Sequence, residues 1–128
     1  MSEKLKVMVV DDEPIVGKRL KPALEKSGYE VEVYETGAEA LKRIEETIFD
    51  IIVTDVRMDE IDGLDILAGV TAKSSHTKVI IITGYATIEL AREALAKGAF
   101  DFIAKPFKPN DLREIIQKAA TALKEESE

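Results

Sequence analysis

The chain has 128 residues, with 18 basic and 25 acidic side chains, no cysteine and a single histidine. Without cysteine there is no disulfide, thiolate metal site or cysteine nucleophile, and one histidine excludes a zinc site that needs several. No apolar run approaches the roughly 18 residues of a membrane span, and the polar start of the chain is unlike a signal peptide. This composition predicts one domain with a conventional core, and the absence of cysteine favours a cytoplasmic location.

The charge is unevenly distributed along the chain. Residues 1–64 hold 16 acidic and 9 basic side chains, a net charge of −7, whereas residues 65–128 hold 9 of each. An acidic surface repels a phosphate backbone, so direct nucleic-acid binding by this domain is not expected. Surplus acid usually forms a solvated surface, and the question is whether some of these carboxylates converge.

The first third of the chain predicts two strands and two helices. The apolar, mostly β-branched run Leu5–Val10 is typical of a strand covered on both faces. Apolar residues at helical spacing follow and stop at Gly28, a predicted helix end. The run Val31–Tyr34 alternates between apolar and polar residues, which indicates an edge strand. Thr36 and Glu39 then form a potential capping box at the start of a second helix.

The middle of the chain repeats the same alternation. Ile51–Thr54 and Val79–Thr83 are continuously apolar at their centres and predict two more buried strands. Helices are expected from Leu64 towards Lys73 and from Thr87 to Lys97, and Gly98 closes the second of them.

The end of the chain predicts a fifth strand, Phe100–Ile103, and a last helix from Pro109 to Leu123. Residues Lys124–Glu128 lose the helical pattern and are interpreted as a frayed end or the start of a linker, so the domain is expected over residues 1–123. Five strands that alternate with helices predict an open α/β sheet, mostly parallel, with helices on both faces.

Four of the predicted strands end in residues that bind ions. Asp11 and Asp12 follow the first strand, Asp55 the third, Thr83 ends the fourth, and the fifth runs out to Lys105. A single aspartate at a strand end is usually a turn former or a helix cap. Ligands of such sheets bind at the carboxyl ends of the strands, so the joint occurrence of these residues predicts a site there.

The residue types at these strand ends indicate phosphoryl chemistry. Three carboxylates held close together repel one another unless one is protonated or a cation lies between them. Oxygen ligands without nearby histidine or cysteine favour a hard ion, and Mg²⁺ suits a site of few carboxylates that shares a phosphoryl group. Thr83 and Lys105 would then donate to the anionic oxygens of that group.

Four segments around these residues carry a specific combination of side chains: Val9–Glu13, Ile52–Met58 with Gly63, Ile82–Tyr85, and Gly98–Phe102 leading to Lys105–Phe107. Together they resemble the receiver domain of two-component response regulators, over roughly residues 6–123. The resemblance implies a flavodoxin-like, doubly wound, five-stranded parallel sheet in the order 2-1-3-4-5 with five helices on both faces. The segments at 83–87 and 98–102 resemble receivers of enhancer-binding transcription activators in particular.

The resemblance implies a magnesium-dependent phosphoacceptor site. Asp55 would accept the phosphoryl group from a histidine kinase. Asp12 would bind Mg²⁺ directly, Asp11 mainly through a metal-bound water, and Asp55 and the backbone carbonyl of Arg57 would complete the protein ligands. The domain would catalyse its own phosphorylation and its slow dephosphorylation without being a conventional enzyme.

The resemblance also implies a switch. Thr83 and Lys105 would contact the phosphoryl oxygens, and Gly84 would leave the phosphoryl group accessible. The bond from Lys105 to Pro106 is commonly cis in the family and would aim the ammonium into the site. Phe102 would turn inward as Thr83 moves onto the phosphoryl group, the alternative being a plain core phenylalanine.

Three further positions are interpreted through the same resemblance. Arg57 and Tyr85 would tune hydrolysis by controlling water access, or else be surface residues without kinetic weight. Asp59 stands where the family usually has proline, which predicts a looser loop or an altered metal affinity. His76 is expected to be a loop residue and not a phosphodonor.

The implied partners are a sensor histidine kinase, expected on the first helix (Ile15–Lys26), and an output domain or partner protein on the face formed by residues 88–123. The apolar stripe of the fourth helix could equally be core. A phosphorylation-dependent homodimer, a stand-alone receiver and a fragment of a longer regulator all remain open.

Two other function classes share part of this pattern. A phosphatase with an aspartyl nucleophile needs an Asp-x-Asp pair after its first strand, whereas Asp11 and Asp12 are adjacent. A flavodoxin-like cofactor-binding module needs a small or Gly-rich loop there, and the Asp11–Glu13 carboxylates would repel its phosphate.

Overall fold

The computed structural model of the chain describes residues 4–58, 60–85 and 87–126. Within them strand and helix alternate five times, which confirms the α/β prediction. None of the described helices has the length and apolarity that a membrane span requires. The elements are β1 (Lys6–Val10), α1 (Pro14–Lys26), β2 (Glu30–Tyr34), α2 (Gly37–Glu46), β3 (Ile51–Asp55), α3 (Gly63–Lys73), β4 (Lys78–Thr83), α4 (Ile88–Ala96), β5 (Asp101–Ala104) and α5 (Pro109–Glu126).

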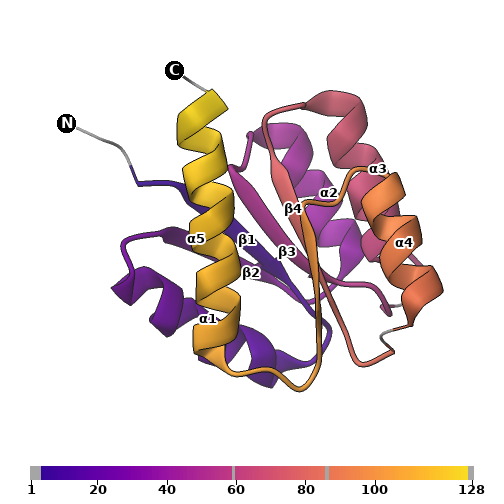
Figure 1. Ribbon diagram of the computed structural model, residues 1–128, viewed down its shortest axis with the longest axis horizontal. Helices are drawn as coiled ribbons and strands as arrows, with labels where there is room; N and C mark the ends of the chain where they lie inside the picture. Colours follow the sequence, from indigo (N-terminus) through magenta and orange to yellow (C-terminus); the bar gives the residue numbers. More distant parts are fainter. Residues whose placement is uncertain (1–3, 59, 86, 127–128) are drawn as a thin grey trace.

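The five strands form one parallel sheet in the order β2-β1-β3-β4-β5, the order that the resemblance implied (Figure 1). The alternating run therefore lies at an edge, as predicted, and the continuous apolar runs lie inside. From β1 the chain crosses to one side to form β2, and it then crosses back to form β3. The carboxyl ends of β1 and β3 are the switch point at which ligands of such sheets bind.

Each face of the sheet is covered by helices that bury an apolar stripe. In Figure 1, α1 and α5 lie on one face, and α2, α3 and α4 lie on the other. Because side chains alternate along a strand, each central strand contributes to both cores. Val7, Val9, Ile80 and Ile82 pack with α1 and α5, whereas Met8, Val10 and Ile81 pack with α2, α3 and α4.

The predicted helix ends are present, with one difference in detail. Gly28 and Gly98 have φ angles of +97° and +106°, a left-handed conformation that favours glycine after a helix. At the start of α2 the Thr36 hydroxyl accepts from the Glu39 N–H at 3.2 Å. The Glu39 carboxylate accepts from the same hydroxyl at 3.0 Å, so the reciprocal bond to the Thr36 N–H predicted by a capping box is replaced.

Most predicted boundaries agree with the structure to within one residue, and the end of the last helix differs by more. The fifth strand begins at Asp101, one residue later than expected, and includes Ala104. The last helix continues to Glu126, so Lys124 to Glu126 are not the frayed end expected there. Its final turn is stabilised by an ion pair between Glu126 and Lys78 at the start of β4. A helical pattern read along the sequence does not include such a contact between distant segments.

Candidate functional site at the carboxyl edge of the sheet

The core is apolar except where the central strands end. Apart from Thr54, the buried polar side chains of the described residues are Asp11, Asp55 and Thr83, with exposures of 1%, 5% and 0%. They belong to the ends of β1, β3 and β4. Burying polar groups is unfavourable unless they are paired, so their grouping at one edge of the sheet marks a site.

Lys105, just after β5, supplies the cation at this edge. Its Nζ lies 2.8 Å from Asp11 Oδ2, Glu13 Oε1 and Asp55 Oδ2. The peptide bond from Lys105 to Pro106 is cis, the isomer that the resemblance implied. Burial lowers the pKa of the Lys105 ammonium, but its contacts with the carboxylates of Asp11, Asp55 and Glu13 outweigh this effect and raise the pKa. Lys105 is therefore charged at neutral pH.

The buried Asp11 carboxylate has an incomplete set of hydrogen bonds. Its Oδ1 accepts from the backbone N–H of Glu13 at 2.9 Å. Its buried Oδ2 has no hydrogen-bond partner within the part of the chain that the structure describes, because the ion pair to Lys105 lacks hydrogen-bond alignment. Burial raises the pKa of Asp11, and the interactions with Lys105 offset only part of that rise.

The three predicted metal ligands are close enough to share one ion. Asp11, Asp12 and Asp55 each offer a carboxylate oxygen within 4.8 Å of the other two. Asp12 is exposed, so the cluster opens to solvent. The unsatisfied Asp11 Oδ2 and the all-oxygen donor set fit a hard cation such as Mg²⁺, which keeps several waters. The role predicted for the Arg57 carbonyl stays a prediction.

Thr83 and the loop after β4 form the remaining side of the site. The buried Thr83 hydroxyl accepts from the backbone N–H of Tyr85 at 3.0 Å, so its position is tied to that of the loop. A Cβ built on Gly84 would meet nothing within 4 Å. Gly84 therefore places no side chain next to Thr83, and the access to the phosphoryl group that the resemblance implied for it stays a prediction.

Comparison with known proteins identifies the family. The family model described as "Response regulator receiver domain" matches residues 7–117. The chain is 37% identical to the regulatory protein AtoC of Escherichia coli K12 and 38% identical to the chemotaxis protein CheY of Listeria monocytogenes, over 89% and 91% of its length. The chain belongs to the response regulator receiver domains. These are not conventional enzymes but the receiving modules of two-component response regulators.

Solved receiver structures agree with this assignment. The receiver domain protein of Methanospirillum hungatei JF-1 has a TM-score of 0.92 and 31% identity, and the two chains cover 97% and 99% of each other. The beryllofluoride-activated NtrC4 receiver domain dimer has a TM-score of 0.82 and 35% identity, with 94% and 97% coverage. The chain spans about a quarter of AtoC but 98% of CheY, so its relatives include both long regulators and single-domain receivers.

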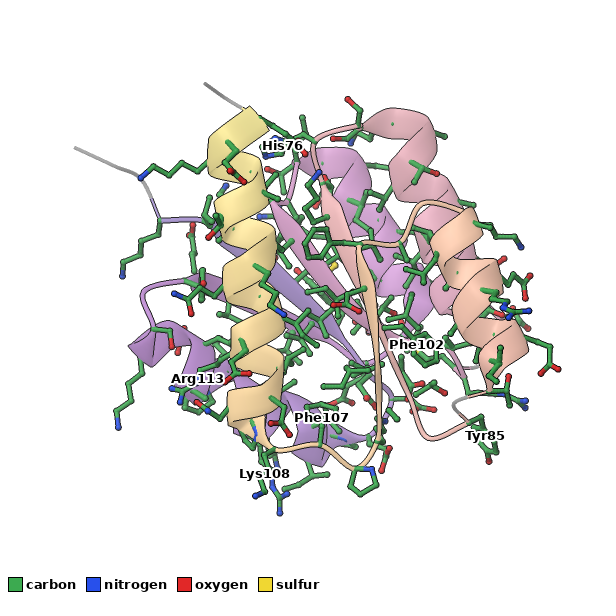
Figure 2. All side chains as sticks on the ribbon, viewed as in Figure 1. His76, Tyr85, Phe102, Phe107, Lys108 and Arg113 are labelled. Atoms are coloured by element: carbon green, nitrogen blue, oxygen red, sulfur yellow. The ribbon has the colours of Figure 1, made fainter. Side chains whose placement is uncertain are left out.

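Figure 2 labels Phe102 and His76, two further residues singled out from the sequence. Phe102 lies between the sheet and α4, half-buried against the core on that face. His76 lies at the opposite end of the strands from Tyr85 and Phe107, where its Nε2 is 2.7 Å from Asp50 Oδ1. His76 is thus a loop residue far from the site, as expected. Asp59, whose effect on the loop after β3 was predicted, lies outside the described residues.

Two contacts of the receiver site were not predicted. Glu13 pairs with Lys105, and that hydrogen bond lowers the pKa of Glu13. The Arg57 guanidinium lies 4.4 Å from the centre of the Tyr85 ring, a cation–π contact between the loops that follow β3 and β4. The only sequence signal for the first was a run of three acids before Pro14. The second joins two residues that the resemblance had singled out separately.

Proposed function

We propose that this receiver takes a phosphoryl group from the phosphohistidine of a sensor histidine kinase onto Asp55 and thereby switches its conformation. The observation that carries the proposal is the placement of Lys105, whose Nζ lies 2.8 Å from carboxylate oxygens of both Asp11 and Asp55. A structural ion pair would need one buried acid, whereas this site buries two around one cation. The proposal includes a cytoplasmic location, with which a domain without cysteine is compatible.

The chemistry required of the chain is a simple displacement. A carboxylate oxygen of Asp55 forms a new P–O bond while the P–N bond to the donor imidazole breaks, and the leaving imidazole takes a proton from solvent. Lys105 would stabilise the negative charge on the phosphoryl oxygens, and Thr83 would donate its hydroxyl to one of them. Mg²⁺ held by Asp11, Asp12 and Asp55, with the Arg57 carbonyl, would offset the charge of the carboxylates and of the phosphoryl group.

The switch proposal starts from the hydrogen bond that Thr83 accepts. If the hydroxyl turns towards a phosphoryl oxygen, the Tyr85 N–H loses its acceptor and the loop after β4 is released to move. Phe102, half-buried beside α4, is placed to follow into the space that Thr83 leaves. The added charge of the aspartyl phosphate would thus bias an equilibrium between two conformations.

The test is covalent labelling. Incubation with a small phosphodonor and Mg²⁺ is expected to add the mass of one phosphoryl group as an acid-stable, base-labile adduct, and EDTA should prevent it. Asp55→Asn should abolish the adduct, whereas His76→Gln, at the other end of the strands, should leave it unchanged. An adduct that persists in Asp55→Asn would refute the assignment of Asp55.

Arg57 and Tyr85 are proposed to slow hydrolysis by closing the mouth of the site. Tyr85 is 60% exposed, and its ring contacts the Arg57 guanidinium, two residues beyond Asp55. An exposed cation–π contact is worth about 0.5–1 kcal/mol, so Tyr85→Ala should speed loss of the phosphoryl group by roughly two- to fivefold. Decay of the phosphorylated protein measures this effect. Tyr85→Phe keeps the ring and should decay like the wild type, and equal decay of all three proteins would exclude a role for the stack.

Two surfaces are proposed for partners. A cavity of about 390 Å³ beside Lys105 is lined by Val16 and Leu20 of α1 and by Phe107, and we propose the kinase there. On the 88–123 face, Ile88 and Leu95 of α4 are 69% and 50% exposed, which supports an output domain, a partner protein or a second copy at this face. Sizing with and without beryllofluoride and Mg²⁺ tests the second copy, because an unchanged mass would exclude the homodimer.

A further inference from the structure

The three carboxylates around Lys105 are not equivalent. The side chains of Asp11 and Asp55 are 0% and 7% exposed, whereas that of Glu13 is 60% exposed. Water can replace the cation for Glu13, but the two buried acids have no such substitute. Of the three contacts, the one to Glu13 is therefore the easiest to break.

The backbone of Glu13 is fixed while its side chain is not needed by the helix. Glu13 is the N-cap of α1, its N–H donates to Asp11 Oδ1, and its carbonyl accepts from the Val16 N–H. N-cap side chains usually bond the first turn of the helix, but the Glu13 side chain makes no such bond. It is directed instead at Lys105, with a hydrogen bond of 2.8 Å.

The Lys105 ammonium is already surrounded by carboxylates. It donates hydrogen bonds to Glu13 and Asp55 at 2.8 Å, and Asp11 Oδ2 lies 2.8 Å from its nitrogen as an ion pair. A phosphoryl group on Asp55 would bring further anionic acceptors, placed beyond the carboxyl oxygens. The Lys105 ammonium can move towards these phosphoryl oxygens only by weakening one of its present contacts.

We propose that Glu13 is a positioning residue that holds Lys105 in the unphosphorylated domain and competes with the phosphoryl group for the ammonium. The inference rests on the proposed function of Asp55. Glu13→Gln keeps the size of the side chain and removes its charge, so Lys105 is released in advance. Beryllofluoride, a mimic of the phosphoryl group on aspartate, is then expected to bind with Mg²⁺ about two- to fivefold more tightly, the range of exposed charge pairs.

The experiment measures the dissociation constant of beryllofluoride by fluorine NMR at saturating Mg²⁺. Glu60→Gln is the matched control, because Glu60 is an exposed acid on the loop after β3 and is not one of the three partners of Lys105. It should bind like the wild type. If Glu13→Gln and Glu60→Gln bound beryllofluoride more tightly by the same factor, the cause would be the general loss of negative charge, and the proposal would be overturned. Unchanged or weaker beryllofluoride binding in Glu13→Gln would also overturn it.

A double-mutant cycle with Lys105→Met separates competition for Lys105 from direct repulsion of the anion. If Glu13 acts through Lys105, Glu13→Gln changes the affinity only where Lys105 is present. A gain of the same size in the Lys105→Met background would overturn the proposal. In the ligand-free protein, ¹⁵N NMR of the lysine ammonium groups gives a further readout, because Lys105 should exchange its protons faster in Glu13→Gln, and an unchanged rate would contradict the contact.

Failure of the proposed function would look different. If beryllofluoride bound the wild type and Asp55→Asn equally, the assignment of Asp55 would fail and the role of Glu13 with it. If binding needs Asp55 but is insensitive to Glu13, the receiver function stands and only this inference is lost.

Discussion

Lys105→Met is expected to lower the free energy of unfolding of the metal-free protein by about 2–3 kcal/mol. The substitution keeps much of the apolar stem but leaves the buried carboxylates of Asp11 and Asp55 without their cation. Removing one partner of a buried ion pair typically costs about 3–5 kcal/mol, and the opening of this site to solvent lowers the expected value below that range. Urea unfolding in EDTA measures the loss.

Mg²⁺ should restore much of that stability. A ligand that binds only the folded state stabilises it by mass action, and a cation at the three aspartates would replace the missing charge. The rise in Tm with Mg²⁺ is therefore expected to be larger in Lys105→Met than in the wild type. Lys97→Met removes an exposed lysine paired with Glu93 and should leave the stability nearly unchanged. Equal stabilities of Lys105→Met and Lys97→Met would show that the cluster does not depend on its cation.

The fold could be predicted because its signals are local. Continuous β-branched runs identify buried strands, and the glycines at 28 and 98 identify helix ends, so the order of elements follows from the chain alone. The end of α5 could not be predicted in this way. Its last turn carries an ion pair between Glu126 and Lys78, which are far apart in the sequence, and no local pattern includes such a contact.

The site could be predicted as a set of residues but not as a set of contacts. The rule that ligands bind at the carboxyl ends of parallel strands brings Asp11, Asp55, Thr83 and Lys105 to one edge, and the structure places them there. The direction of a long side chain depends on tertiary packing. For that reason the pairing of Glu13 with Lys105 was not found from the sequence.

Asp11→Asn is expected to stabilise the metal-free protein and to abolish its response to Mg²⁺. The Asp11 carboxylate is 1% exposed, and one of its oxygens has no hydrogen bond within the described ranges. A buried polar atom without a hydrogen bond costs about 1–3 kcal/mol, and more when it is charged, so the neutral amide should gain about 1–2 kcal/mol while Lys105 retains Asp55 and Glu13. Urea unfolding with and without Mg²⁺ measures both effects.

The stability that Asp11→Asn gains over the wild type should increase with pH. Burial raises the pKa of Asp11 above its ordinary value of 3.8, so between the unfolded and folded pKa values the folded state binds more protons. Stability contributed by such a group falls as the pH rises through the folded pKa. The advantage of Asp11→Asn over the wild type should therefore be small below pH 3.8 and complete above the folded pKa.

Asp12→Asn separates the two effects of Asp11. Asp12 belongs to the same carboxylate cluster but is exposed, so its charge is already solvated. This variant should lose the response to Mg²⁺ without gaining stability in EDTA. If Asp11→Asn were less stable than the wild type at neutral pH, the buried carboxylate would be a structural group. If it is more stable, Asp11 is kept at a cost to folding, which is expected of a residue that serves to bind a cation.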